Sequence, residues 1–156
     1  MKIWILRHGQ AESMAASDPE RALTEYGRRE ASVVAKLLDG EPLDNILASP
    51  YLRAQQTAEL VSSTVAYPRG ISTAAWLTPD DDPHQVLGFL AERNERSLLL
   101  VSHQPLVGRL ISLLIEGHEG GHYPMPTAGL ACVEVDFPAA GIGHLQLLTS
   151  PGELSS

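Results

Sequence analysis

KIWILRHGQAE, at residues 2–12, begins with the apolar run KIWIL and passes at residue 7 into the polar sequence RHGQAE. An apolar run without polar alternation is typical of a strand that is buried on both faces of a sheet. Gly9 allows the backbone to turn sharply as soon as the strand ends. The stretch therefore predicts a central strand that delivers Arg7 and His8 to one edge of the sheet.

The same succession of an apolar strand, a polar turn and a helix recurs along the chain. Strands are predicted at residues 45–48, 97–101, 130–137 and 144–149, and helices at 24–39, 51–63, 83–93 and 106–115. This alternation is typical of an α/β fold, and we expect a three-layer domain whose largely parallel central sheet carries helices on both faces. Residues 1–150 are predicted to form one domain and residues 151–156 a flexible tail.

Chemically active side chains follow three of the predicted strands. Arg7 and His8 end the first strand. Arg53 lies in the first turn of the helix after the second strand, and His103 follows the third. Because the carboxyl ends of parallel strands share one edge of the sheet, where ligands bind in such folds, we expect these side chains to meet there.

This set of side chains indicates a site for a phosphoryl group. The planar guanidinium of arginine matches the edge of a tetrahedral oxyanion, so Arg7 and Arg53 can clamp one. A neutral histidine can attack phosphorus, and neighbouring positive charge favours the neutral form of His8. His103, if protonated, would donate to the oxygens as charge moves in the transition state. Each residue alone has an ordinary structural reading, such as a solvated arginine or a helix cap, and only the joint placement points to a site.

The motifs LRHGQAE, ALTEYG, SPYLRAQQTAEL and LVSHQPLVGRL, in this order, resemble the histidine phosphatase superfamily and its phosphoglycerate mutase-like fold. The resemblance spans residues 1–114, and PTAGLACVEV is similar to a late strand of the family. It implies a metal-independent phosphatase in which His8 accepts the phosphoryl group. It further implies that Arg7 and Arg53 bind the phosphate, that His103 is the second histidine of the pocket, and that no cofactor takes part.

Within this family, the segment from RHG through ALTEYG and the LTP at 77–79 are similar to the short bacterial phosphohistidine phosphatases of the SixA type. That branch implies a phosphohistidine on a protein as substrate, such as a phosphotransfer domain of a two-component relay. The short chain agrees, because a mutase needs extra loops that shelter its phosphoenzyme from water. A small-molecule phosphomonoesterase acting on sugar or nucleotide phosphates is the alternative. A mutase and a catalytically idle phosphate-binding module are the remaining hypotheses.

Two further residues are candidate substrate ligands, and the general acid is open. Arg21 precedes ALTEYG and can either reach the rim or lie on the surface, and Gln104 is predicted to offer its backbone N–H. The candidate acids are the carboxylates near the motifs: Glu12, Asp18, Asp80, Asp81 and Asp82. We interpret the acidic run at 80–82 as a cap for the helix at Pro83. A missing acid is tolerable for phosphohistidine, because imidazole leaves more readily than an alkoxide.

Composition restricts the partners. A formal charge of -8 argues against nucleic acid and anionic lipid, and no apolar run approaches the ~20 residues of a membrane span. The single cysteine, Cys132, cannot form an internal disulfide and is read as part of the core, so a cytoplasmic location is expected. His118 and His122 follow no standard ligand spacing, and no metal site is predicted. Nothing demands an oligomer, and we expect a monomer.

Overall fold

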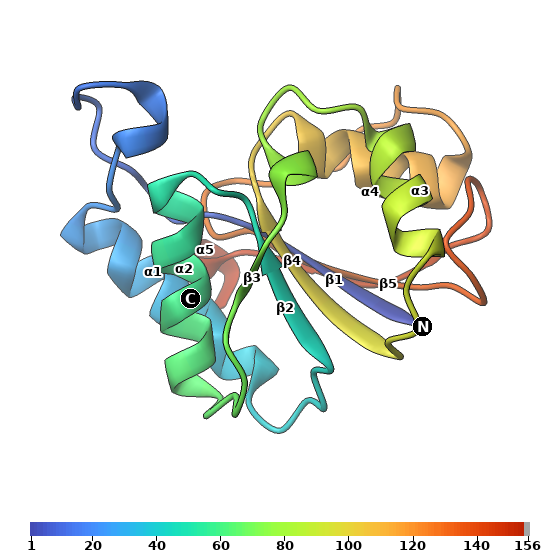
Figure 1. The fold of residues 1–156 in the computed structure, drawn as a ribbon, viewed down its shortest axis with the longest axis horizontal. Helices are drawn as coiled ribbons and strands as arrows, with labels where there is room; N and C mark the ends of the chain where they lie inside the picture. Colours follow the sequence, from blue (N-terminus) through green and yellow to red (C-terminus); the bar gives the residue numbers. More distant parts are fainter. Residues whose placement is uncertain (155–156) are drawn as a thin grey trace.

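The computed structural model describes residues 1–154 and arranges them around a six-stranded mixed sheet (Figure 1). The strands are β1 (Lys2–Arg7), β2 (Asn45–Ala48), β3 (Ser72–Thr73), β4 (Ser97–Ser102), β5 (Leu130–Glu134) and β6 (His144–Thr149). They are ordered β3-β2-β4-β1-β5-β6, with the first four parallel and the last two antiparallel to their neighbours. The predicted α/β fold with a largely parallel sheet is confirmed.

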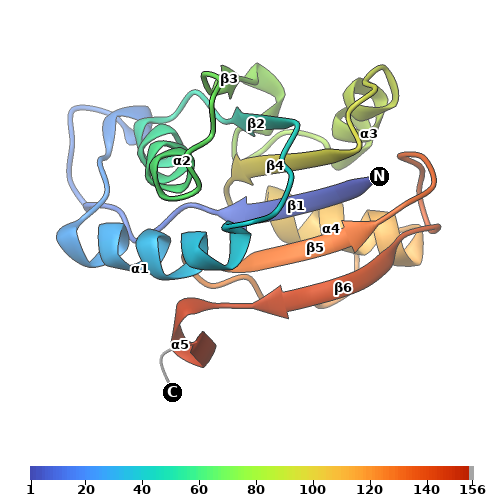
Figure 2. The ribbon, with the colours of Figure 1, turned by 90° about the horizontal axis from the view of Figure 1, so that it is seen from below.

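Helices cover both faces of this sheet. They are α1 (Glu25–Ala35), α2 (Leu52–Thr64), α3 (Pro83–Ala91), α4 (Leu106–Glu116) and the short α5 (Pro151–Leu154), with 3-10 turns η1 (Asp18–Glu20), η2 (Lys36–Leu38) and η3 (Ala75–Leu77). Helices α1 and α2 lie on one face, and α3 and α4 lie on the other (Figures 1 and 2). The layers follow from the crossover rule, because each parallel strand must return through a helix that packs on the sheet.

Strand β1 is central because neither of its faces meets water. Its successive side chains point to opposite layers: Ile3 and Ile5 pack with α3 and α4, whereas Trp4 and Leu6 pack with α1 and α2. Cys132 on β5 belongs to the second of these cores, as predicted, and burial raises the pKa of its thiol to about 11. The period-two alternation therefore builds two separate cores from one apolar run.

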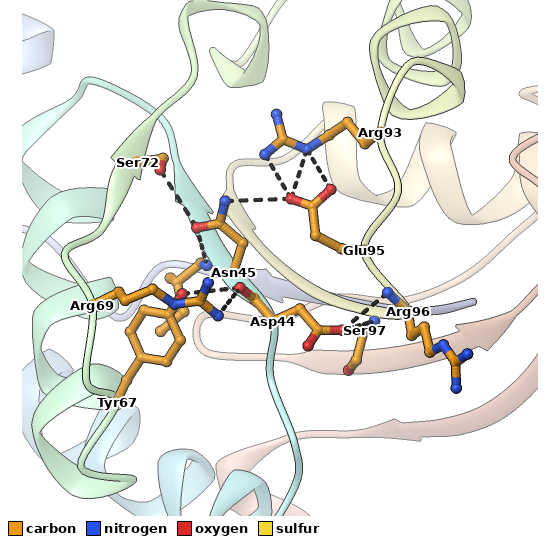
Figure 3. Close-up of polar contacts among 10 residues, drawn as sticks. Asp44, Asn45, Tyr67, Arg69, Ser72, Arg93, Glu95, Arg96 and Ser97 are labelled. Carbon is orange, nitrogen blue, oxygen red and sulfur yellow. Dashed lines mark hydrogen bonds and ion pairs between the residues drawn. The ribbon is translucent and has the colours of Figure 1, made fainter.

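The amino end of the sheet is closed by a polar network (Figure 3). The Asp44 carboxylate accepts the backbone N–H of Arg96 at 2.9 Å, and its carbonyl accepts from the Arg69 guanidinium. Arg93 forms an ion pair with Glu95 at 2.6 Å. A shallow hollow of about 610 Å³ lies over this network. These groups join the start of β2 to the start of β4, at the end opposite to the predicted site.

The chain departs from expectation in a few segments. The first four residues of the predicted flexible tail form α5, with Pro151 buried, while residues 155–156 lie outside the described residues. Strand β5 ends at Glu134 rather than at 137, and β3 at the sheet edge was not predicted because two exposed residues carry no hydrophobic pattern. None of the helices in residues 1–154 has the length and apolar character that crossing a bilayer requires.

Two glycines allow the turn after β1 to lie directly on the first turn of α1. A Cβ on Gly27 would overlap the carbonyl oxygen of Gln10, and a Cβ on Gly9 would overlap the carbonyl of Gly27. Thr24 caps α1 by accepting the Gly27 N–H at 2.9 Å, and its own N–H bonds to the Gln10 carbonyl at 3.0 Å. The turn that carries His8 is therefore fixed against a helix end.

Replacing Gly27 by alanine should force these two backbone segments apart and lower the free energy of unfolding by roughly 1–3 kcal/mol, the usual cost of overpacking. Gly88, inside α3, is the matched control, because a methyl group added there would meet no atom within 4 Å. Gly88→Ala should leave stability unchanged or raise it by up to about 1 kcal/mol. Denaturant unfolding of both variants measures the difference, and equal stabilities would contradict the close contact.

Candidate active site

The carboxyl ends of β1, β2 and β4 point to the same edge of the sheet, and backbone hydrogen bonds align them (Figure 2). The His8 N–H donates to the Ser102 carbonyl at 3.0 Å, and the Ala128 N–H donates to the His8 carbonyl at 2.9 Å. The Ser49 N–H donates to the Val101 carbonyl at 3.0 Å. The hydrogen-bond ladder thus continues beyond the ends of the strands, and the His8 backbone is bonded on both sides. The ends of these strands lie together at one edge of the sheet, as predicted.

His8 is a buried, uncharged imidazole. Its Nδ1 lies 2.6 Å from the Gly9 carbonyl, which can only accept, so Nδ1 carries the proton and Nε2 keeps its lone pair. The Arg53 Nε–H donates to that Nε2 at 3.3 Å. Burial, together with the charges of Arg53, Arg7 and Arg21, lowers the pKa of His8 from 6.5 to about 4, against the opposing Gly9 bond. The arginines lower the pKa of His8 as predicted from the sequence, but burial lowers it more.

His103 lies beside His8, with 5.0 Å between the ring centroids. Its Nε2 is 2.7 Å from the Ser49 Oγ. Burial, and then the neighbouring His8 and Arg53, lower the pKa of His103 to about 3. The ring is therefore neutral in the free protein, and the protonated donor considered from the sequence is not its resting form.

Arginine donors surround the two rings. The Arg53 guanidinium is buried and lies over the Tyr51 ring at 5.1 Å, while the same ring meets the edge of His103 at 4.9 Å. Arg7 donates from Nη1 to the Met125 carbonyl at 3.0 Å. The Arg7 Nε and the His103 Nδ1 are buried without a hydrogen-bond partner. Such orphaned polar atoms are costly, and two in one cluster indicate a place for a polar ligand.

Asp18 bridges Arg53 and Arg21, the arginine predicted from the sequence to bind substrate. Both Nη groups of Arg53 donate to Asp18, at 2.7 Å to its carbonyl and 3.1 Å to its carboxylate Oδ2. Arg21 donates from Nη1 to the other carboxylate oxygen at 2.7 Å and from Nε to the Glu12 carbonyl at 2.6 Å. The hydrogen bond from Arg21, with those from Arg53, lowers the pKa of Asp18. A carboxyl held in its charged form is a poor proton donor at neutral pH.

The remaining candidates serve helix ends. The Gln104 side chain accepts the Gly108 N–H at 3.0 Å and so caps α4, while the role of its backbone N–H stays a prediction. Asp82 accepts the N–H of His84 at 2.9 Å, so the interpretation of the acidic run at 80–82 as a cap for α3 is confirmed for Asp82. Asp81 accepts the N–H of Thr78 at 2.8 Å in the turn before that helix.

Two supporting residues, Thr57 and Glu30, gave no signal in the sequence. Thr57, fully buried on α2, accepts the Gly9 N–H at 3.2 Å and donates to the Arg53 carbonyl at 2.8 Å. Glu30 accepts the backbone N–H of Gln10 at 2.9 Å and the Thr127 hydroxyl at 2.9 Å. Their partners in the His8 turn, Gly9 and Gln10, are 48 and 20 residues away in the chain, so no local motif marks them. Through these hydrogen bonds, α2 and α1 fix the backbone of Gly9 and Gln10, the two residues after His8.

One group of described side chains has the arrangement of metal ligands. Single ligand atoms of Asp82, His84 and Glu119 lie within 4.8 Å of one another, on the exterior of the molecule. These residues already pair with each other, with His84 Nδ1 at 3.2 Å from Asp82 and 3.3 Å from Glu119. They share no residue with the strand-end cluster, so a metal bound there would not touch His8.

The strand-end cluster can bind a tetrahedral oxyanion and attack it. Arg7 and Arg53 supply fixed charge, the orphaned nitrogens supply free hydrogen-bonding capacity, and His8 presents an unprotonated Nε2. Positioned donors in a water-poor site stabilise developing charge more strongly than in bulk solvent. The arrangement therefore suits nucleophilic transfer of a phosphoryl group to histidine.

Comparisons with known proteins agree with this geometry. Residues 3–73 match the family model described as "Histidine phosphatase superfamily (branch 1)". The chain is 36% identical over 152 residues to phosphohistidine phosphatase SixA of Escherichia coli K12, covering 94% of this chain and 93% of that protein. It is 37% identical over 126 residues to the SixA homolog of Haemophilus influenzae, covering 73% and 77%. The solved structure of the protein histidine phosphatase SixA complexed with tungstate superposes with a TM-score of 0.88 at 34% identity, covering 99% of both chains.

The electrostatics of the two rings can be tested in the free protein. At pH 6, where a histidine with the ordinary pKa of 6.5 is mostly protonated, His8 and His103 should both be neutral, and His8 should show the Nδ1–H tautomer. Nitrogen-detected NMR of the imidazoles, assigned with His8→Asn and His103→Asn, measures this. The unfolded chain would then bind more protons than the folded one between about pH 6.5 and 4, so stability should fall as the pH falls through that window. A titration of His8 near 6.5 would contradict the cause given for its pKa.

Proposed function

The chain belongs to the histidine phosphatase superfamily and is a phosphatase, and we propose that it removes phosphate from a phosphorylated histidine of a signalling protein through a phospho-His8 intermediate. The observation that carries the proposal is the state of His8. Its Nδ1 proton is donated to the Gly9 carbonyl, and its Nε2 lone pair accepts the Arg53 Nε–H. The ring is thus prepared for attack without a separate base.

In the first step, His8 Nε2 forms a bond to phosphorus while the bond from phosphorus to the substrate imidazole breaks in line. Arg7 and Arg53 hold the phosphoryl oxygens, and the orphaned Arg7 Nε gains the partner that it lacks in the free protein. The SixA relative was solved in complex with tungstate, a tetrahedral oxyanion like phosphate, which supports binding of such an anion by this fold.

In the second step, water attacks phospho-His8 and releases inorganic phosphate, which restores the neutral ring. A phosphoryl dianion next to His103 opposes the charges that lower its pKa, so protonation of this ring becomes easier when the pocket is occupied. His103 can then act as the additional donor. Ser49 and Tyr51 keep the ring in place through the 2.7 Å hydrogen bond and the edge contact.

The leaving group favours phosphohistidine over phosphate esters. An imidazole departs without the strong general acid that an alkoxide requires. Asp18 is held in its charged form by two arginines and Asp82 caps α3, so neither is free to donate a proton. A protein substrate, such as a phosphotransfer domain, fits this chemistry. A cytoplasmic, monomeric enzyme that uses no metal or organic cofactor is part of the same proposal, and the single buried Cys132 agrees with a reducing compartment.

The test measures phosphate release from a phosphohistidine-bearing phosphotransfer domain beside a panel of phosphate esters, with EDTA present. We expect release from the protein substrate, and His8→Ala should reduce it on the order of 10³-fold or more because the attacking nitrogen is lost. An acid-labile phosphoenzyme should form on wild type and be absent from the variant. If an ester is preferred, His8 remains the proposed nucleophile but the substrate is a small metabolite. Full activity of His8→Ala would refute the mechanism.

A further inference from the structure

The loop after β1 places a carboxylate on the same arginines that the proposed function assigns to phosphate. Asp18 belongs to the 3-10 turn η1 and binds Arg53 and Arg21 through different carboxylate oxygens, at 3.1 and 2.7 Å. Its side chain is 52% exposed, whereas that of Arg53 is 5% exposed. The two carboxylate oxygens of Asp18 thus bridge two arginine side chains beside His8.

The contact leaves every nitrogen of the Arg53 guanidinium with a hydrogen-bond partner. Its Nε–H points to His8 Nε2, and its Nη1 and Nη2 groups point to the carbonyl and carboxylate of Asp18. Arg53 is buried, and its charge would be costly without a counter-ion in the free protein. Among the ion pairs found in residues 1–154, Asp18 supplies the one carboxylate that contacts this guanidinium.

We propose that Asp18 is a resident counter-anion and a specificity-determining residue, whose carboxylate competes with phosphate for Arg53 and Arg21. The proposal rests on the function proposed above. A phosphoryl dianion that settles between His8 and Arg53 brings its oxygens close to the Asp18 carboxylate, and the two anions repel each other. Bound phosphate therefore competes with Asp18 for the charge and the N–H groups of these arginines.

This competition selects among phosphate compounds. A small anion has only its phosphate contacts to offset the displacement of Asp18, so free phosphate and small esters bind weakly. A phosphohistidine on a protein adds contacts outside the strand-end cluster, and these contacts offset the displacement of Asp18. Asp18 thereby favours a protein substrate and the release of the phosphate product.

The experiment titrates inorganic phosphate into the protein by calorimetry. Asp18→Asn keeps the size and an acceptor oxygen but removes the charge, and Asp18→Ala removes both. Glu20→Gln is the matched control, because Glu20 lies on the same turn and its carboxylate accepts from the Ser17 hydroxyl rather than from an arginine. Both Asp18 variants should bind phosphate about fivefold more tightly than wild type, the factor expected for a partly exposed charge, and Glu20→Gln less than about twofold.

A second readout uses p-nitrophenyl phosphate, for which KM should fall in both Asp18 variants by a similar factor. Weaker or unchanged phosphate binding in the two variants would overturn the proposal and make Asp18 a positioning residue for Arg53. An equal increase in phosphate affinity in Glu20→Gln would overturn the proposal as well, because the change in affinity would then follow from the net charge of the protein. Phosphate binding requires no substrate and no phosphoenzyme, so this result is independent of whether the proposed turnover of phosphohistidine is found.

Discussion

The parallel ladder between β1 and β4 does not stop at the last strand residue. The His8 amide donates to the Ser102 carbonyl, and the His8 carbonyl accepts from Ala128, so the nucleophile's backbone is held as firmly as a strand residue. Gly9 then turns the chain against the start of α1, at a separation that only glycine allows. Pocket geometry thus follows from sheet register, because a one-residue shift of β1 would carry the His8 side chain to the other face of the sheet.

The hydrogen-bond ladder of the sheet positions the side chains of the site. Burial and charge compensation then determine which of them are charged. Two imidazoles and a guanidinium are withdrawn from water at one edge of an acidic protein. The rings respond by staying neutral, whereas Arg53 keeps its charge and acquires Asp18 as partner. Neutral nitrogen next to fixed positive charge is a combination that attracts a phosphate dianion without quenching the nucleophile. The same burial that lowers the pKa of His8 therefore preserves its reactivity.

Much of the architecture could be predicted because it depends on local patterns. Apolar runs marked β1 and β4, turn residues marked their ends, and the parallel arrangement then required His8, Arg53 and His103 to share an edge. The supporting contacts could not be predicted in this way. Thr57 and Glu30 each hold the His8 turn from a different helix, and no spacing in the chain links them to it. The pairing of Asp18 with Arg53 depends on the path of a polar loop, which has no hydrophobic period to reveal it.

The carboxylates of Asp18 and Asp82 limit which leaving groups the site can protonate. Asp18 contacts two arginines and Asp82 caps α3, and these contacts lower the pKa of both carboxyls. Both are therefore charged at neutral pH and are poor proton donors. A phosphate ester would have to expel an alkoxide into such a site, whereas a phosphoramidate expels a nitrogen base that water or the departing protein can protonate. Among the polar contacts of His8, Arg53 and His103 in the described chain, the carboxylate is that of Asp18, whose pKa is lowered by its arginine partners. The proton for a leaving alkoxide would therefore have to come from another group.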